Sequence, residues 1–278
     1  MNHKKTIVYL HRYPIEYESI IYPATERILK LLKKKYNVVW VSMKNPGKID
    51  QKLRKGISFV ELPWTVDRKN GKDKLIKTAL WFLSAFKIRK IIKESKADFI
   101  VHKEQLPFLP YFFSSMEIPL LLDIGDWWWT TLFGGTKIGS KFAEVMENFE
   151  MRLYGRKNNV FMSAHSLTEA KVLEERGMNG KRVRFINHPA SQTHFKPVDA
   201  QKLRKKLGLE NSFVVSMHGI IHPSKGYDQI LTWWADISKD KKDWKLMIIG
   251  GGTGEKWCRN KIKSLGIENS TIMTGWIK

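Results

Sequence analysis

Cysteine is almost missing from this sequence: Cys258 is the single one in 278 residues. One cysteine cannot form an internal disulfide, and no cysteine and histidine residues are spaced like the ligands of a zinc site. We therefore expect no metal site. The composition fits a protein of the reducing cytoplasm, including the inner face of the cell membrane.

Long apolar runs are also missing. The run Ile7–Leu10 near the N-terminus is too short for a signal peptide. The longest run, Ala79–Phe86, is well below the roughly 20 residues that a membrane-spanning helix needs. No segment of the sequence predicts a membrane span.

Acidic residues are scarce beside basic ones, with 27 Asp and Glu against 49 Lys and Arg and a formal net charge of +22. Such a charge attracts polyanions: nucleic acid, anionic lipid head groups or phosphorylated substrates. Because the basic residues are spread along the chain, solvated helix faces explain them as well as a functional surface does. No nucleic-acid-binding motif accompanies the charge, so we expect no nucleic-acid partner.

One basic stretch, Lys74–Lys96, predicts a long helix that carries Trp81, Phe82 and Phe86. A helix of this kind packs against a sheet or lies on an anionic membrane. We favour packing, and keep peripheral membrane contact as the alternative.

Strands alternate with helices over most of the chain, which predicts α/β domains with parallel sheets and helices on both faces. The expected strands are Thr6–Leu10, Asn37–Met43, Ile57–Leu62, Asp98–His102, Pro119–Ile124, Asn159–Ser163, Arg182–Ile186, Phe213–Met217, Lys245–Ile249 and Thr271–Met273. The expected helices are Tyr22–Lys35, Lys74–Lys96, Lys141–Tyr154, Leu167–Arg176, Asp199–Leu207, Tyr227–Ile237 and Glu255–Leu265.

The alternation is interrupted by a stretch with two prolines and no periodicity, which predicts a linker at 188–198. The chain also exceeds the usual size of one compact unit. We therefore predict an N-terminal domain at 1–187 and a partial C-terminal domain at 199–278.

Glycines follow two strands of the C-terminal domain, at Gly219 and at Gly250–Gly254, and Lys225 stands beside the first. A strand that runs through glycines into a helix forms an anion pocket from backbone N–H groups and the helix N-terminus. The second loop lacks the dinucleotide pattern because Glu255 replaces the third glycine, so NAD is not expected. A nucleotide sugar fits this loop better, and a simple turn stays the alternative.

Five stretches resemble one protein family in order and spacing. HGIIHPSKGYDQIL, IIGGGTGE and MTGWIK resemble the start of the donor domain of retaining GT-B glycosyltransferases, the large group-4 family (glycosyl transferases group 1). FINHPASQTHFKP is similar to the family's interdomain linker, and PLLLDIGDWW to a stretch of its acceptor domain. The resemblance implies an α/β GT-B fold of two Rossmann-like domains with parallel sheets, the second incomplete because the family's other donor-contacting segment would follow Lys278.

The resemblance also implies an activity. The expected protein is a metal-independent, retaining hexosyltransferase that moves a sugar from a nucleotide-diphosphate sugar to a glycan or lipid-linked acceptor in cell-envelope glycan biosynthesis. It needs no cofactor, since the nucleotide sugar is a substrate, and a chain ending at Lys278 is expected to be inactive or nearly so. Two other hypotheses stay open: a nucleotide-sugar epimerase of the same fold, and a non-catalytic basic protein that binds an anionic membrane or another polyanion.

By resemblance, the donor is bound by two glycine loops and two cations. These residues are Gly219, Lys225, Gly226, Gly251, Gly252 and Arg12. The Lys225 ammonium would neutralise the charge that grows on the leaving diphosphate. Ile220 occupies the position where many members of the family carry an arginine, so one expected cation is replaced by an apolar residue.

Two aspartates follow the strand Pro119–Ile124, at the end of a strand where open α/β sheets bind their ligands. Asp126 is the catalytic candidate through a contact with a sugar hydroxyl, and capping of a turn is its alternative role. Asp123 and Trp127 are the candidates for acceptor binding. Three adjacent tryptophans cannot all face one side, so at least one of them is expected to pack internally.

Overall fold

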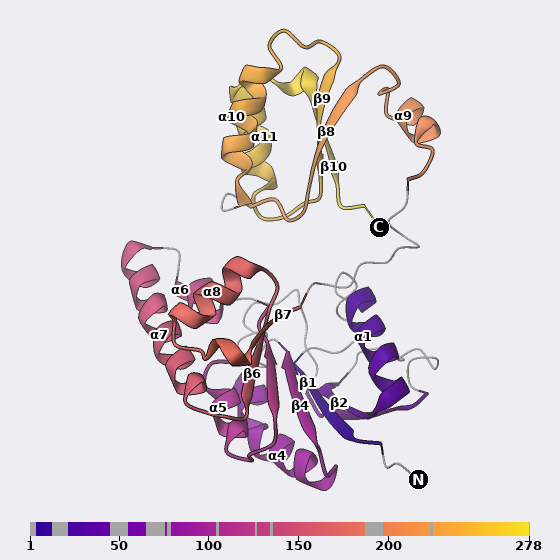
Figure 1. The fold of residues 1–278 in the computed structure, drawn as a ribbon. Helices are drawn as coiled ribbons and strands as arrows, with labels where there is room; N and C mark the ends of the chain where they lie inside the picture. The colour runs from indigo at the N-terminus through magenta and orange to yellow at the C-terminus, as the bar shows by residue number, and fades with distance from the viewer. Residues whose placement is uncertain are drawn as a thin grey trace. The chain divides into compact units, whose positions relative to one another are not determined.

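The computed structural model describes residues 4–12, 22–44, 55–64, 76, 79–103, 106–125, 127–133, 136–186, 197–222 and 225–277. The chain divides into two compact units, Met1–Gln192 and Thr193–Lys278 (Figure 1). This division falls within 188–198, the range predicted as a linker. Most of that range lies outside the described residues.

The first unit is built on a seven-stranded parallel sheet among the described residues, with the order β3-β2-β1-β4-β5-β6-β7. The strands are β1 Thr6–His11, β2 Asn37–Met43, β3 Ile57–Leu62, β4 Phe99–Lys103, β5 Leu120–Asp123, β6 Val160–Ala164 and β7 Val183–Phe185. Each lies within one residue of the range predicted from the sequence. Their nearly continuous apolar runs suit strands that are covered on both faces.

The described helices of this unit are α1 Tyr22–Lys35, α4 Ala85–Glu94, α5 Leu109–Ser114, α6 Trp128–Phe133, α7 Lys137–Gly155 and α8 Leu167–Glu175, with a 3₁₀ turn, η2, at Gly180–Arg182. α7 begins one turn earlier than predicted because the Thr136 hydroxyl accepts a hydrogen bond from the Gly139 N–H at 3.0 Å and caps the helix. The short helices α5 and α6 were not predicted.

The prediction of one helix over Lys74–Lys96 was wrong in its continuity. Residues 79–83 are helical, Ser84 forms a turn, and α4 follows. The Ser84 hydroxyl donates to the Leu80 carbonyl at 2.8 Å and accepts from the Trp64 indole N–H at 3.1 Å. The second bond connects the turn to the segment that follows β3. Trp81, Ile88 and Ile92 are fully buried, so this stretch packs on the sheet as we favoured.

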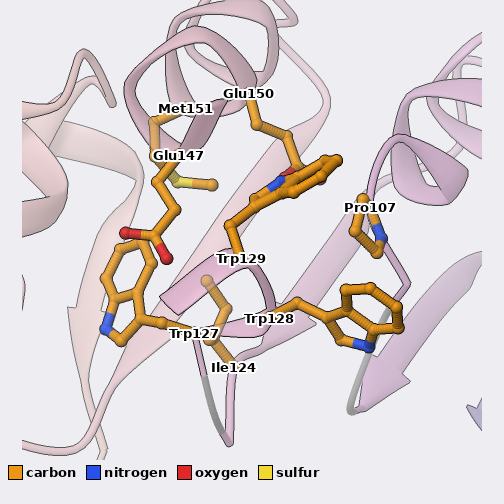
Figure 2. Close-up of a pocket in the computed structure, with 8 residues that line it drawn as sticks. All are labelled: Pro107, Ile124, Trp127, Trp128, Trp129, Glu147, Glu150 and Met151. Atoms are coloured by element: carbon orange, nitrogen blue, oxygen red, sulfur yellow. The ribbon is translucent and has the colours of Figure 1, made fainter. Parts of the chain in front are cut away.

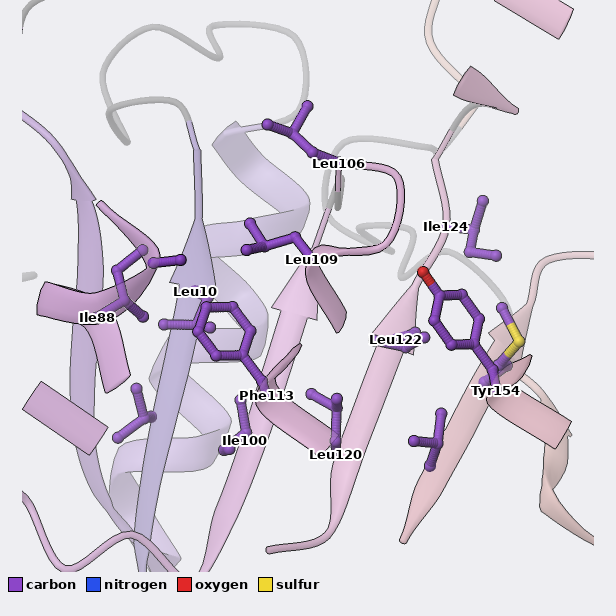
Figure 3. Close-up of a cluster of buried hydrophobic side chains, with 14 of the residues drawn as sticks. Leu10, Ile88, Ile100, Leu106, Leu109, Phe113, Leu120, Leu122, Ile124 and Tyr154 are labelled. Atoms are coloured by element: carbon purple, nitrogen blue, oxygen red, sulfur yellow. The ribbon is translucent and has the colours of Figure 1, made fainter. Parts of the chain in front are cut away.

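Two apolar layers cover the two faces of the first sheet. One contains Leu10, Phe113, Leu122 and Tyr154 (Figure 3). The other is smaller and centres on Tyr9, whose ring stacks on that of Trp40 with 4.9 Å between centroids. Successive residues such as Tyr9 and Leu10 enter opposite layers because side chains alternate along a strand.

The second unit has a three-stranded parallel sheet among its described residues, in the order β10-β9-β8. Its elements are α9 Gln201–Lys206, β8 Phe213–His218, α10 Tyr227–Ile237, β9 Trp244–Ile249, α11 Glu255–Ser264, the 3₁₀ turn η4 Glu268–Ser270 and β10 Thr271–Gly275. α10 and α11 lie side by side on one face of the sheet (Figure 1), and Lys261 pairs with Asp228 across them at 2.9 Å. Cys258 lies in the core between helix and sheet.

A histidine in the core of the first unit makes its stability depend on pH. His102 is fully buried in β4, with its ring edge-on to Phe113 at 5.6 Å. Burial, and after it the electrostatic effect of the nearby His11 and Arg12, lowers the pKa of His102 from 6.5 to about 3. The folded protein therefore keeps this imidazole neutral where an unfolded chain would protonate it.

We expect the free energy of unfolding to fall as the pH drops from 6.5 towards 3. The unfolded state binds a proton at His102 in this window and the folded state does not, which gives a loss of about 2 kcal/mol at pH 5. His102→Leu should remove that part of the pH dependence in urea unfolding at pH 7 and pH 5. His218→Leu, at an exposed position, should keep it, and identical profiles for wild type and His102→Leu would contradict the assignment.

Candidate functional site

Polar side chains line the carboxyl edge of the first sheet. The backbone registers pair His11 with Lys103, Lys103 with Asp123, and Asp123 with Ser163, so four neighbouring strands carry polar residues at the same level. Ligands of open parallel sheets bind at this edge. The row therefore forms a candidate site within the first unit.

One half of the row is cationic. Arg12 and Lys103 are each only 7% exposed, and His11 is fully buried with its ring stacked on Trp40 at 5.3 Å. Arg12, which we predicted to bind the donor, thus belongs to a concentrated group of basic residues at the ends of β1 and β4. A group of this kind suits an anionic ligand.

The other half of the row centres on Asp123, a predicted acceptor-binding residue. One carboxylate oxygen of Asp123 accepts from the Ser163 hydroxyl at 2.8 Å and lies 3.1 Å from His165 Nε2. The His165 Nδ1 lies 3.3 Å from the Ile186 carbonyl oxygen. Asp123 and His165 each remain about one-fifth exposed, so their polar groups reach the surface.

Local structure fixes the position of His165. Ser166 caps α8 by accepting from the Glu169 N–H at 3.0 Å, and the Glu169 carboxylate accepts from the His165 N–H at 2.6 Å. This reciprocal pair is close to a capping box. Sequence reasoning missed Ser163 and His165. The available signal was their place at and just after the end of a predicted strand, but their meeting with Asp123 depends on the sheet register.

Asp126, the predicted catalytic residue, lies outside the described residues. Its neighbour Trp127 is half-buried, and the Arg176 guanidinium lies 4.2 Å from the centre of its ring. Arg176 also forms an ion pair with Glu147. Trp127 therefore packs against a cation–π partner in the structure.

The three tryptophans surround a cavity of about 20 Å³, large enough for one water molecule and too small for a sugar ring. Figure 2 shows Trp127, Trp128 and Trp129 around it, with Glu147 and Glu150 descending from α7. The cavity is part of the packing of this loop and is not a substrate pocket. Any sugar contact of Trp127 would be on its exposed side.

Two buried carboxylates organise the segment Trp127–Thr130, which runs into the first turn of α6 and which we call the tryptophan loop. Glu147 accepts from the Thr130 N–H at 2.9 Å and from the Thr130 hydroxyl at 2.8 Å. Glu150 accepts from the Trp129 indole N–H at 2.9 Å and from the Phe108 N–H at 2.8 Å, and it also accepts from the Tyr154 hydroxyl. Burial and this carboxylate raise the pKa of Tyr154 well above 10. Sequence reasoning did not identify either glutamate.

Glu150→Gln should destabilise the first unit, because the amide places an N–H group against atoms that are themselves donors. The expected loss is about 1–3 kcal/mol in urea unfolding, with a shift of the Trp129 indole N–H resonance in NMR spectra. Glu144→Gln, on the exposed side of the same helix, is the control and should change neither. Unchanged stability in Glu150→Gln would show that the loop does not depend on this carboxylate.

The second unit brings its two glycine loops into contact. Gly219 and Gly250 have positive φ values of 135° and 137°, which favour glycine. A Cβ at Gly250 would overlap the Gly219 carbonyl oxygen. The loops are joined by hydrogen bonds from the Ile221 N–H to the Gly251 carbonyl and from the Gly254 N–H to the Ile221 carbonyl, both 3.0 Å.

The predicted donor-binding residues of this unit gather at one end of the sheet. Gly226 has φ 79° and precedes the first turn of α10, and Lys225 directly before it has an exposed side chain. A Cβ at Gly251 would lie 2.7 Å from the Trp276 indole nitrogen, and one at Gly252 would lie 2.7 Å from the Ile221 carbonyl oxygen. The site thus combines the backbone of the glycine loops, the N-terminus of α10 and the exposed ammonium group of Lys225.

Gly250→Ala should destabilise the second unit more than Gly266→Ala. Both glycines have positive φ, but a Cβ at Gly266 meets nothing within 4 Å. Gly266→Ala therefore bears the backbone strain alone, roughly 1–2 kcal/mol, whereas Gly250→Ala adds a clash with rigid backbone. Thermal unfolding compares the two variants, and equal midpoints would contradict the close contact.

The described ranges hold no group of three His, Cys, Asp or Glu side chains that could bind a metal ion. None of the described helices combines the length and apolarity needed to cross a lipid bilayer.

Sequence comparison finds a family match for the second unit. Residues 199–278 match the family described as Glycosyl transferases group 1. A relative from Haemophilus influenzae, named as an uncharacterized glycosyltransferase, is 39% identical over 62 residues, which cover 22% of this chain and 17% of that protein. The matched segment thus spans less than a fifth of the relative.

Solved structures of glycosyltransferases resemble nearly the whole chain. Anabaena HepE in complex with UDP-glucose has a TM-score of 0.64 and 17% identity, covering 98% of this chain and 69% of its own. The sucrose-phosphate synthase of Thermosynechococcus elongatus has a TM-score of 0.67 and 11% identity, with 99% and 71% covered. WaaG, a glycosyltransferase involved in lipopolysaccharide biosynthesis, has a TM-score of 0.63 and 13% identity, with 98% and 70% covered.

Likeness at this level of identity shows the fold. The chain has the α/β fold of GT-B glycosyltransferases, and its residues 199–278 match the family described as Glycosyl transferases group 1.

Proposed function

We propose that this protein is a retaining, metal-independent hexosyltransferase that moves a sugar from a nucleotide-diphosphate sugar to a glycan or lipid-linked acceptor. The observation that carries the proposal is the pair of touching glycine loops beside Lys225, in the segment that matches the family. Similarity to HepE, which was solved with UDP-glucose, and to WaaG supports a nucleotide-sugar donor and a role in cell-envelope glycan synthesis.

The donor diphosphate is assigned to the second unit. Backbone N–H groups at the start of α10 and α11 favour anions, since both helix dipoles present their positive ends there. In the proposed reaction the bond between the anomeric carbon and the diphosphate oxygen breaks, and Lys225 offsets the charge that develops on the leaving group. Gly251 and Gly252 let the diphosphate approach the backbone closely, and Arg12 is proposed as a further cation from the first unit.

The acceptor is assigned to the carboxyl edge of the first sheet. Asp123, with Ser163 and His165 in contact, offers the acceptor and donor groups that bind sugar hydroxyls. The acceptor oxygen then bonds to the anomeric carbon, and its proton leaves with the diphosphate. Asp126 as the catalytic contact and Trp127 as a stacking surface remain proposals.

The two alternatives are not favoured, because the matched family and the similar structures are transferases. Product analysis separates the epimerase: a transferase forms its product only with an acceptor present. The non-catalytic hypothesis predicts salt-sensitive binding of any polyanion without preference for a nucleotide. We also propose a cytoplasmic location at the inner face of the cell membrane, in keeping with a lipid-linked acceptor.

Isothermal titration of the chain with UDP and UDP-glucose tests the donor site. Lys225→Ala should weaken binding about 10- to 100-fold, the loss expected for one charge-assisted contact. Lys263→Ala removes an equal charge from the exposed last turn of α11 and should bind like the wild type. Equal affinity of Lys225→Ala and wild type would remove Lys225 from the site.

A further inference from the structure

Helix α7 exposes an apolar face and buries charged side chains, unlike an ordinary surface helix. It buries two carboxylates, Glu147 and Glu150, which are 2% and 6% exposed. Its outward face carries large apolar side chains instead. These are Ile138, Phe142, Val145 and Phe149, which are 84%, 46%, 63% and 51% exposed. Their spacing of four, three and four residues places them in one stripe along the helix.

The stripe continues onto α6. Leu132 and Phe133 are about half exposed, and the Phe133 ring packs edge-on against Phe142 at 5.2 Å and beside Trp129 at 6.1 Å. We define the α7 surface as Leu132, Phe133, Ile138, Phe142, Val145 and Phe149. A contiguous apolar area of this kind on a highly charged protein marks an interaction site.

The exposed charges of α7 are mainly basic. Lys141 and Arg152 are exposed and lie beside the stripe, three residues after Ile138 and three after Phe149. Glu144 is exposed too, and it lies on the flank of the stripe, three residues after Lys141. The remaining described carboxylates of α7, Glu147 and Glu150, face the interior. The α7 surface is therefore apolar and cationic together.

The contacts of the two buried glutamates fix this orientation. Glu147 accepts from the Thr130 N–H and hydroxyl and also pairs with Arg176. Glu150 accepts from the Trp129 indole N–H and from the Phe108 N–H. Rotating α7 to bury its apolar stripe would break these hydrogen bonds, and each donor left buried and unsatisfied would destabilise the unit. The apolar face is held outward by the interior of its own unit.

This combination selects among the classes of partner. A nucleic acid uses cations but not exposed Ile, Val and Phe side chains. A second copy of the chain in a two-fold contact would bring Lys141 and Arg152 of both copies together, and the like charges would repel. An anionic bilayer takes the apolar side chains into its interface and the cations among its head groups.

We propose that the α7 surface docks this protein onto an anionic membrane, with α7 lying in the plane of the interface. The proposed function places the protein at the inner face of the membrane, and this proposal names the surface that makes the contact. It rests on the proposed function only for the reason why the protein would bind a membrane. The helix predicted at Lys74–Lys96 buries Trp81, Ile88 and Ile92 against the sheet. It leaves Leu83 and Phe86 72% and 76% exposed, so the experiment compares this region with the α7 surface.

Vesicle flotation with the full chain tests the proposal. Wild type should float with vesicles of 30% phosphatidylglycerol in phosphatidylcholine and bind pure phosphatidylcholine much more weakly. Val145→Ser/Phe149→Ser should reduce binding to the anionic vesicles tenfold or more. Lys141→Gln/Arg152→Gln should reduce it by roughly 30-fold at low salt and weaken the preference for anionic lipid.

The matched control is Leu83→Ser/Phe86→Ser, which removes two exposed apolar side chains from the α4 region and should float like the wild type. Circular dichroism and thermal unfolding check that every variant is folded. No flotation of wild type, equal flotation of the α7 variants, or an equal loss in the α4 control would overturn the proposal. So would a change from dimer to monomer in the α7 variants without an effect on flotation.

UDP titration of the same proteins keeps this proposal separate from the proposed function. Loss of flotation with UDP affinity unchanged supports the docking surface by itself. Flotation without UDP binding in the wild type would overturn the nucleotide-sugar function and leave the membrane surface standing.

Discussion

The carboxylates that α7 directs into the first unit govern the loops above its main sheet. Glu150 holds the backbone at Phe108 in a left-handed conformation with φ 60°, and α5 starts from there. Glu147 binds the first turn of α6 and, through Arg176, the chain after α8. Three segments that are far apart in the sequence therefore share one pair of anions. The position of the tryptophan loop follows from that sharing.

The same pair accounts for the division of charge in this unit. A carboxylate survives burial when several donors satisfy it, and these two are satisfied by loops and by Arg176. Because Glu147 and Glu150 take up part of the inward side of α7, several of its large apolar side chains face outward. Exposed basic side chains and exposed apolar side chains therefore lie together on the outward side of this helix.

Much of the fold could be predicted from the sequence because parallel strands buried on both faces are written as short continuous apolar runs. All ten strands of the described residues were found on this basis, the first nine to within one residue at either end. α5 and α6 escaped prediction because neither has a local signal: Pro110 and adjacent tryptophans do not suggest helices, and both helices depend on hydrogen bonds to α7. The turn at Ser84 has no local signal either, and its hydroxyl contacts the Trp64 indole N–H 20 residues away in the sequence.

Some residues of the candidate sites could be predicted from the sequence and others could not. Gly219, Lys225 and Gly250 could be identified because strand, glycine and lysine follow one another within a few residues. Ser163 and His165 could not, because their relation to Asp123 exists only once β5 and β6 are in register. A role for Asp126 stays a prediction, as that residue lies outside the described ranges.

The contact between Gly250 and the Gly219 carbonyl has a thermodynamic consequence. Loops packed this closely and joined by two hydrogen bonds have few separate conformations, so each is already ordered by the other. When an anion binds at these loops, the protein therefore loses little conformational entropy. Affinity in such a site comes from preorganisation as much as from charge. Donor binding is therefore compatible with Ile220 at the position where the family resemblance led us to expect an arginine.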